Sequence, residues 1–184
     1  MRARTWEGHM RRMRACLLLV VSALVPASAI SQRARPEEKT KSAAVFKQLS
    51  ALAGEWEGKQ DSVPIAVTYT LVGDGSALME YMKPENSPTA AMITMFTVDG
   101  DHLIATHYCA AGNQPQMVTG SPGTLEQGVT FSLVRVTGMK TPDDFHNTGL
   151  TFMLDDKEHI TQRWTYSYKG KTGANVFHYA RKGR

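Results

Sequence analysis

The feature that most constrains this chain is a side-chain period of two that runs from residue 55 almost to the C-terminus. Apolar side chains occupy every second position in several segments, at Ile65, Val67, Tyr69 and Leu71, at Val129, Phe131 and Leu133, and at Leu150, Phe152 and Leu154. Turn-forming residues interrupt the pattern roughly every ten positions. This spacing makes one face of a β-strand apolar, whereas a helix would need a period of 3.6. The chain is therefore predicted to be all-β.

Ten strands are predicted from this alternation and from the turns between them. They cover residues 55–60, 64–72, 77–82, 91–98, 102–109, 116–120, 129–137, 149–154, 159–168 and 175–181. The short links favour antiparallel neighbours, and there is no βαβ alternation to support a parallel sheet. Closing such a sheet on itself covers its one apolar face and removes its two edges. We therefore expect a single antiparallel up-and-down β-barrel, with a two-sheet sandwich as the competing architecture.

One short amphipathic helix is expected ahead of the barrel. Val45, Phe46, Leu49 and Leu52 have the spacing of one helical face, and Gly54 ends the pattern. Residues 30–42 are charged and almost without apolar side chains, so they are predicted to be a flexible tether. The barrel domain is assigned to residues 43–184.

Residues 1–29 have the order of a secretory signal peptide. Five arginines, Arg2, Arg4, Arg11, Arg12 and Arg14, precede an apolar run over residues 16–25, which Pro26-Ala27-Ser28-Ala29 follows. The run is about half of the roughly 20 residues that a membrane-spanning helix needs, so we expect cleavage after Ala29 and no remaining membrane anchor. The protein is expected to be periplasmic or extracellular, with Met1, Met10 or Met13 as its start.

Charge and cysteine content restrict the partners of the exported form. When the five arginines and one glutamate of residues 1–29 are taken from the 21 basic and 17 acidic residues, 16 of each remain. A formally neutral domain lacks the basic surface of a nucleic-acid binder, so no nucleic-acid partner is expected. Cys109 is then the one remaining cysteine, which rules out an intramolecular disulfide.

The segment Gly54-Glu55-Trp56-Glu57-Gly58 opens the first predicted strand. This G-x-W pattern resembles the start of the lipocalin and calycin barrels, in which a short helix precedes the strand and the tryptophan seals the barrel floor. In that superfamily a basic residue of the last strand packs over the tryptophan. The resemblance therefore implies a cation–π contact between Trp56 and Arg181, with structural roles for both at the barrel floor.

Four segments together resemble a family of secreted bacterial proteins of unknown function with lipocalin-like barrels. They are residues 54–58, residues 75–80 (GSALME), residues 106–117 (THYCAAGNQPQM) and residues 160–164 (ITQRW). These segments span nearly the whole domain, so the resemblance implies the fold. It implies no reaction.

Residues 106–117 are the most unusual part of the chain and supply the first candidate ligand-binding residues. His107 and Cys109 share one strand face with Leu103 and Ala105, which predicts that both point inward. Asn113 and Gln114 follow in a predicted loop, where their amides would orient a polar ligand at the barrel mouth. The competing interpretation is a buried core histidine, a buried thiol and an ordinary turn.

The remaining candidates lie on predicted inward faces of other strands. Tyr69, Trp164 and Tyr166 would line the cavity, and Gln162 falls on the same face as Trp164. A buried amide needs a hydrogen-bond partner or a ligand. Glu80, between Met79 and Tyr81, is expected to be solvated. Methionines of the domain would adapt a cavity wall to apolar ligands, although they also fill ordinary cores.

Metal and haem binding are alternatives. His107, Cys109 and His146 could form a metal site only if the fold gathered them, because no paired ligand spacing is present. The chain also resembles, more distantly, the nitrobindin-like haem barrels, which begin with G-x-W-x-G and place an iron-binding histidine on the last strand. That resemblance makes His178 the haem candidate, but periodicity does not decide which face of residues 175–181 points inward.

The function expected from these patterns is binding of a small, apolar ligand inside an exported barrel, with no cofactor required. A second hypothesis is an enzyme that uses His107 as a general acid or base, and no catalytic residue beyond it is assigned. A third is a structural or partner-binding barrel with a closed core.

Overall fold

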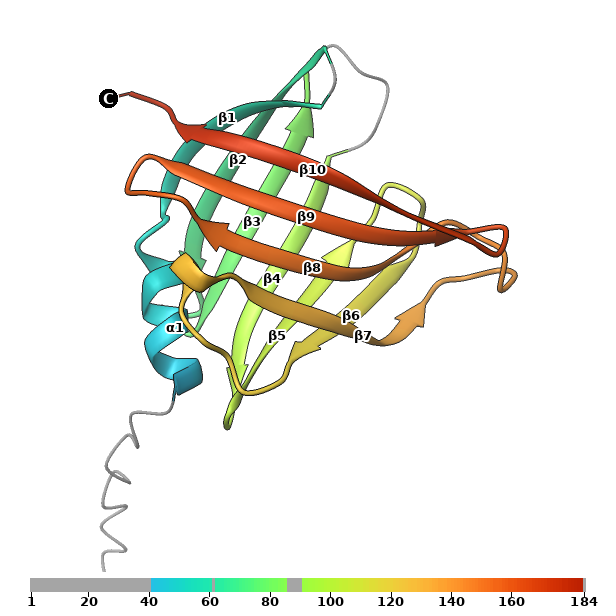
Figure 1. Ribbon diagram of the computed structural model, residues 1–184, viewed down its shortest axis with the longest axis horizontal. Helices are drawn as coiled ribbons and strands as arrows, with labels where there is room; N and C mark the ends of the chain where they lie inside the picture. The colour runs from blue at the N-terminus through green and yellow to red at the C-terminus, as the bar shows by residue number, and fades with distance from the viewer. Residues whose placement is uncertain (1–40, 61, 86–90, 184) are drawn as a thin grey trace, which may run out of the picture. The chain divides into compact units, whose positions relative to one another are not determined.

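The segments of period two form ten antiparallel strands that close into one barrel. The computed structural model describes residues 41–60, 62–85 and 91–183. The strands are β1 (Gly54–Gln60), β2 (Val63–Val72), β3 (Ala77–Pro84), β4 (Met92–Asp99), β5 (His102–Tyr108), β6 (Gln114–Thr119), β7 (Val129–Thr137), β8 (His146–Leu154), β9 (His159–Tyr168) and β10 (Lys171–Arg181). Each strand pairs with its neighbour in the chain, and β1 also pairs with β10 (Figure 1). The predicted up-and-down barrel is confirmed, and the sandwich alternative is wrong.

The seam between β1 and β10 closes the barrel. Trp56 lies opposite Arg181, and Lys59 lies opposite His178. Gly58, midway along the seam, has no room for a side chain, because a Cβ there would collide with the ring of Tyr179 and the carbonyl oxygen of His178. The second glycine of the G-x-W-x-G pattern thus permits the close approach of the two strands.

Alternation decides which side chains fill the interior. Two-residue steps along each strand place the large apolar side chains inside, and these form one continuous core with Trp56, Tyr69, Phe96, Phe131, Phe152 and Tyr179 among its largest members. On β10 the inward set includes Phe177 and Tyr179, whereas Val176 and His178 are exposed on the outer face. The register question that the sequence left open on the last strand is thereby answered.

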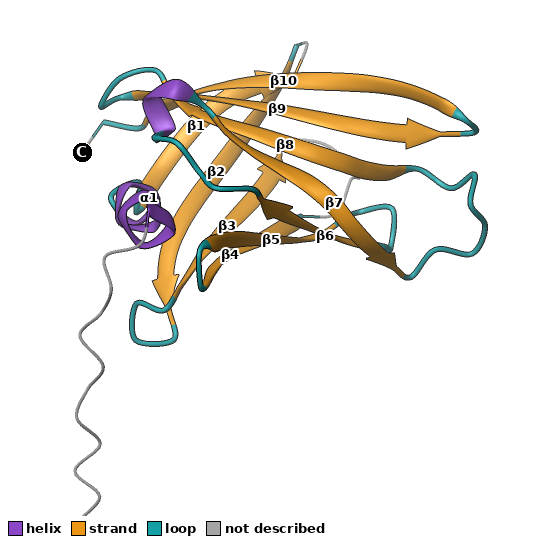
Figure 2. Cartoon of the chain, turned by 60° about the horizontal axis from the view of Figure 1, so that its bottom comes forward, coloured by secondary structure: helices purple, strands orange, loops and turns teal. Residues whose placement is uncertain are grey.

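Helix α1 (Lys41–Ser50) lies at the end of the barrel where β1 begins, beside the short 3₁₀ helix η1 (Leu125–Gln127) (Figure 2). Its buried Val45 and Leu49 join the barrel core. Ser42 Oγ donates to the carbonyl oxygen of Gly100 at 2.6 Å, and Gln48 accepts a hydrogen bond from the Leu125 amide at 3.1 Å. Contacts to two different loops therefore fix the helix over this end.

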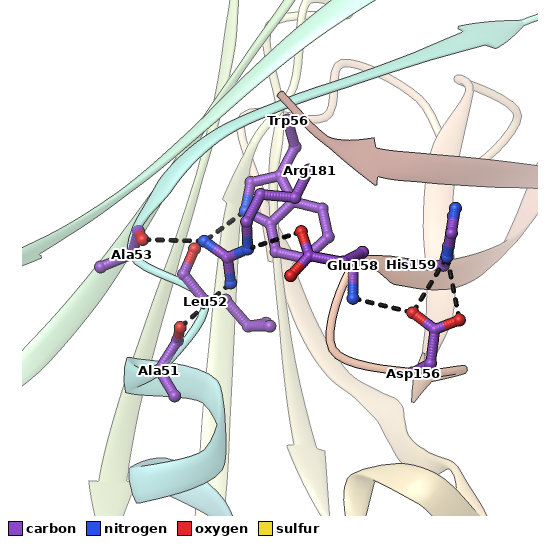
Figure 3. Close-up of polar contacts among 8 residues, drawn as sticks. All are labelled: Ala51, Leu52, Ala53, Trp56, Asp156, Glu158, His159 and Arg181. Atoms are coloured by element: carbon purple, nitrogen blue, oxygen red, sulfur yellow. Dashed lines mark hydrogen bonds and ion pairs between the residues drawn. The ribbon is translucent and has the colours of Figure 1, made fainter. Parts of the chain in front are cut away.

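Trp56 and Arg181 occupy the same end (Figure 3). The Trp56 ring is 1 % exposed, and its Nε1 donates to the carbonyl oxygen of Leu52 at 2.8 Å. The guanidinium carbon of Arg181 lies 4.3 Å from the Trp56 ring centroid, and its two terminal nitrogens donate to the carbonyl oxygens of Ala51 and Ala53, each at 3.2 Å. One side chain thus covers the tryptophan and satisfies carbonyl groups beyond the end of α1.

The strand boundaries differ from the prediction mainly where periodicity is interrupted. β8 begins at His146, three residues earlier than expected, because an irregularity between Asn147 and Gly149 breaks the alternation. β6 begins at Gln114, inside the predicted loop. Helix α1 includes Lys41 and Ser42, which were assigned to the tether. The predicted signal peptide lies outside the described residues.

Among the residues that the structure describes, no helix is both long enough and apolar enough to cross a lipid bilayer.

Replacing Arg181 tests its clamp on the barrel floor. Arg181→Ala removes the cation–π contact and two charge-assisted hydrogen bonds, so it should lower the free energy of unfolding by about 1–2 kcal/mol in urea titrations. Arg181→Lys should lose most of that stability too, because an ammonium group does not reproduce the planar fork that reaches both carbonyls. Arg163→Ala, on the exposed outer face of β9, is the matched control and should change stability by less than about 0.5 kcal/mol. Equal losses at the two positions would refute the assignment.

Candidate functional site

The barrel interior is not filled completely at the end opposite α1. β1 begins beside α1 at Gly54, and its last residue, Gln60, borders a cavity of about 260 Å³. The apolar part of the wall comprises Met82, Met92, Phe145, Trp164 and Phe177, and the polar part includes Gln60, His107, Asn147 and Asn175, with Cys109, Ala110 and Ala111 beside them. The wall of the cavity is therefore mostly apolar and carries a few polar side chains, as in small-molecule sites.

His107 is the titratable imidazole of this wall. It is 3 % exposed, and its ring centroid lies 4.8 Å from that of Trp164. Its Nδ1 lies 3.0 Å from Thr94 Oγ1 on the neighbouring strand β4. Burial lowers the pKa of His107 to about 4, so the ring is neutral at ordinary pH.

Behind His107 lies a buried polar network centred on Glu80. Tyr69 Oη lies 2.6 Å from Glu80 Oε2, and Gln162 Nε2 donates to the same oxygen. Thr94 Oγ1 lies 3.2 Å from Glu80 Oε1 and thereby connects the carboxyl group to His107. Gln162 Oε1 accepts from Trp164 Nε1 at 2.8 Å, which brings the network back to the cavity wall.

Glu80 is 1 % exposed, so the expectation that it is solvated is wrong. Its inward direction follows from β3, where Leu78, Glu80 and Met82 are buried and Lys83 is exposed. Burial raises the pKa of Glu80, against the hydrogen bonds from Tyr69, Gln162 and Thr94 that lower it. Burial and the nearby carboxyl group also raise the pKa of Tyr69 well above its usual range.

The structure brings some of the predicted ligand-binding residues to the cavity and places others behind it. His107, Cys109 and Trp164 line the cavity. Tyr69 and Gln162 belong to the network behind the wall and do not border the cavity.

Three further candidates lie away from the cavity. Asn113 is buried, and its Nδ2 donates to the carbonyl oxygen of Phe145 at 2.5 Å, so this amide links two loops of the rim. Gln114 accepts from Thr137 Oγ1 on the outer side of the barrel. Tyr166 packs against Phe145, with ring centroids 5.2 Å apart. The expectation that the two amides orient a ligand does not fit these positions.

Cys109 is half-buried. Burial raises its pKa, and its sulfur accepts a hydrogen bond from the Ala111 amide at 3.5 Å. A raised pKa disfavours the thiolate that nucleophilic catalysis requires.

The metal and haem candidates are dispersed. His146 Nδ1 donates to the carbonyl oxygen of Asp144 at 2.9 Å, and His146 does not border the cavity that His107 and Cys109 line. In the described part of the chain no group of three or more histidine, cysteine, aspartate or glutamate side chains could hold a metal ion. His178 is exposed on the outer face beside Thr161, so its side chain does not reach a haem held inside the barrel.

Sequence reasoning missed several residues of this site. Glu80 and Thr94 escaped notice because a lone polar residue on a strand ordinarily marks the solvent face. The cavity residue Asn147 lies two residues before the predicted start of its strand, and Asn175 lies at the predicted start of its own strand. The sequence did carry a signal for two of these residues. Asn175 is two positions from Phe177, and Glu80 is two positions from Leu78, so each shares a strand face with an apolar side chain.

Comparison with known proteins adds no family to this description. No protein-family model matches the chain, and a search of curated proteins finds no significant match.

Tyr69→Phe tests whether the network stabilises the fold. The change deprives Glu80 of one hydrogen bond and leaves the Gln162 amide with one partner fewer, so the free energy of unfolding should fall by about 1–3 kcal/mol in urea. Tyr81→Phe makes the same chemical change on the 37 % exposed outer face of β3 and should be nearly neutral. A neutral Tyr69→Phe variant would show that the network contributes little to stability.

The lowered pKa of His107 predicts a specific loss of stability in acid. Between its usual pKa of 6.5 and the folded value of about 4, the unfolded chain binds a proton that the folded barrel does not. The free energy of unfolding should therefore fall as the pH drops through this window, by ~3 kcal/mol for this group. The raised pKa of Glu80 gives the opposite slope, since it favours the folded state at low pH.

A variant pair isolates the histidine contribution. In His107→Phe, which keeps a ring against Trp164, stability should depend less on pH between 6.5 and 4 than in the parent protein. His178→Phe, on the exposed outer face, should keep the parent slope. Urea unfolding at several pH values measures both, and parallel curves for the parent protein and His107→Phe would contradict the prediction.

Proposed function

We propose that this barrel binds a small, largely apolar molecule in the cavity at its open end. The observation that carries the proposal is a cavity of about 260 Å³ inside a barrel whose opposite end is plugged by α1 and Trp56. The cavity opens to solvent at the barrel mouth, so a ligand can enter it and be surrounded by its wall.

The chemistry of the wall indicates the kind of ligand. Methionine and aromatic side chains supply an apolar surface that adapts to shape, and Asn147, Asn175 and His107 supply separate polar contacts. Within the described residues, no lysine, arginine, aspartate or glutamate borders the cavity. An apolar body with few polar groups therefore matches this wall best.

The same geometry favours binding over general acid–base catalysis by His107. A histidine with a pKa of about 4 is a weak base, and Glu80 reaches it only through Thr94. Cys109, the other titratable group of the wall, has a raised pKa. This arrangement offers a ligand a fixed hydrogen-bonding group and no poised pair of acid and base.

The proposal includes export, which rests on the sequence of residues 1–29. A basic segment, an apolar run and Ala27-Ser28-Ala29 have the order of a cleaved signal peptide. A barrel of this type would then act outside the cytoplasm as a carrier or receptor of its ligand.

Titration with 1-aminoanthracene, a neutral apolar fluorophore that brightens when it leaves water, tests the proposal. The parent protein should show saturable binding of one fluorophore per chain at neutral pH. Asn175→Trp fills the cavity and should weaken binding by at least about tenfold. Val176→Trp is the matched control, because the adjacent side chain points outward and is 48 % exposed, so its affinity should equal that of the parent protein.

Far-ultraviolet circular dichroism confirms that both variants keep the strand content of the parent protein. Equal binding by the two tryptophan variants would place the fluorophore outside the cavity and refute the proposal. Failure of the parent protein to bind the fluorophore would refute it as well.

A further inference from the structure

The hydrogen bonds around Glu80 have a defined direction, which begins at Trp164. An indole N–H only donates, so the Gln162 oxygen must face Trp164 and the Gln162 nitrogen must face Tyr69 and Glu80. Tyr69 Oη therefore accepts from Gln162, and its own proton has Glu80 Oε2 as its acceptor at 2.6 Å. Glu80 Oε2 thus accepts two hydrogen bonds and carries no proton.

The surroundings of Glu80 favour the neutral form of its carboxyl group. The side chain is 1 % exposed, and its hydrogen-bond partners in the described part of the barrel are a phenol, an amide and an alcohol, none of them cationic. Tyr69 and Tyr179 are the titratable groups that act on it electrostatically, and neither supplies a positive charge. Burying a carboxylate without a cation is costly, and this burial raises the pKa of Glu80 and favours the protonated form.

That proton determines the tautomer of His107. Thr94 Oγ1 lies 3.2 Å from Glu80 Oε1 and donates to it when Glu80 is charged. In the neutral acid Oε2 is still occupied by two donors, so the proton lies on Oε1 and the same contact runs from Glu80 to Thr94 Oγ1. The hydroxyl proton of Thr94 is then free to be donated to His107 Nδ1, which lies 3.0 Å away. A neutral imidazole that accepts at Nδ1 carries its proton on Nε2.

The protonated nitrogen has no protein partner. His107 lines the cavity, and its Nε2 makes no hydrogen bond to any residue that the structure describes. Nε2 is not one of the buried side-chain atoms that lack a partner, so the cavity leaves it accessible to water or to an acceptor of a ligand. Because the ring is neutral and none of the described residues that line this wall is a cation, a carboxylate ligand would lose its hydration without gaining a counter-charge.

We propose that the ligand of this cavity is uncharged and carries a carbonyl-type oxygen, which accepts a hydrogen bond from His107 Nε2–H. This inference rests on the proposed function, because it names the ligand class of the same site. The relay Glu80–Thr94–His107 presents a fixed donor in an otherwise apolar space, and the ligand body packs on Trp164 and the methionines.

The tautomer can be measured without any ligand. In ¹⁵N-histidine-labelled protein at neutral pH, the two ring-nitrogen shifts of His107, assigned by their loss in His107→Phe, should show a proton on Nε2 and none on Nδ1. Glu80→Gln is the decisive variant, because a glutamine amide can replace the protonated acid as donor to Thr94. It should keep the Nε2–H tautomer. Thr94→Val removes the relay and should give a mixture of the two tautomers.

The ligand class can be tested by displacement of 1-aminoanthracene. Octan-2-one should displace it about fivefold more strongly than 2-methyl-1-octene, in which a methylene group replaces the carbonyl oxygen, since a net hydrogen bond is worth about that factor. Octanoate should compete more weakly than octan-2-one. In His107→Phe the preference for the ketone over the alkene should disappear.

The outcomes separate this inference from the proposed function. A proton on Nδ1 in the parent protein, or a tautomer that changes in Glu80→Gln or stays unmixed in Thr94→Val, would overturn the relay. Saturable 1-aminoanthracene binding with equal displacement by the ketone and the alkene, or with stronger displacement by octanoate, would overturn the ligand class and leave the binding function intact. Absence of fluorophore binding would instead overturn the proposed function.

Discussion

The pairing of β1 with β10 is the interaction on which the rest of the structure depends. It gives every strand two hydrogen-bonded neighbours and removes the edges that would otherwise remain open. Closure also turns the apolar faces of the strands inward, where their side chains form one core. Cys109, among the described residues, is not part of a disulfide. Gly58 makes this pairing sterically feasible, since a larger residue would push β1 away from Tyr179.

Closure alone would give a barrel with two similar ends, and local chemistry makes the ends different. At one end, α1 covers the core, and Arg181 binds Trp56 and the carbonyl groups that follow the helix. At the other end the side chains stop short of filling the space. Between them lies the Glu80 network, in which Tyr69, Thr94, Gln162 and Trp164 all have hydrogen-bond partners and His107 connects the network to the cavity.

The alternation of apolar and polar residues predicted the architecture well, because residues two positions apart on a strand share a face, and the apolar residues identify the buried one. Leu103, Ala105 and His107 show this, and they lie inward as expected. The site was harder to predict, because its members meet across the barrel: Glu80 and Gln162 are 82 positions apart. No local pattern distinguishes a buried glutamate with three hydrogen-bond partners from a solvated one. Irregular pairing, as between Asn147 and Gly149, also hides residues from a periodic search.

The Arg181 clamp has a consequence for how the chain can vary in length. It anchors one end of β10 against Trp56. Every second side chain from there, at Tyr179, Phe177 and Asn175, then points into the barrel. Deleting or inserting a single residue between these points would turn Asn175 outward while the clamp stayed in place. Length changes in this part of β10 are thus compatible with the cavity when they come in pairs, fall in a turn, or are absorbed by a bulge such as the one in β8. The contact at the barrel floor therefore determines which side chains of β10 reach the mouth.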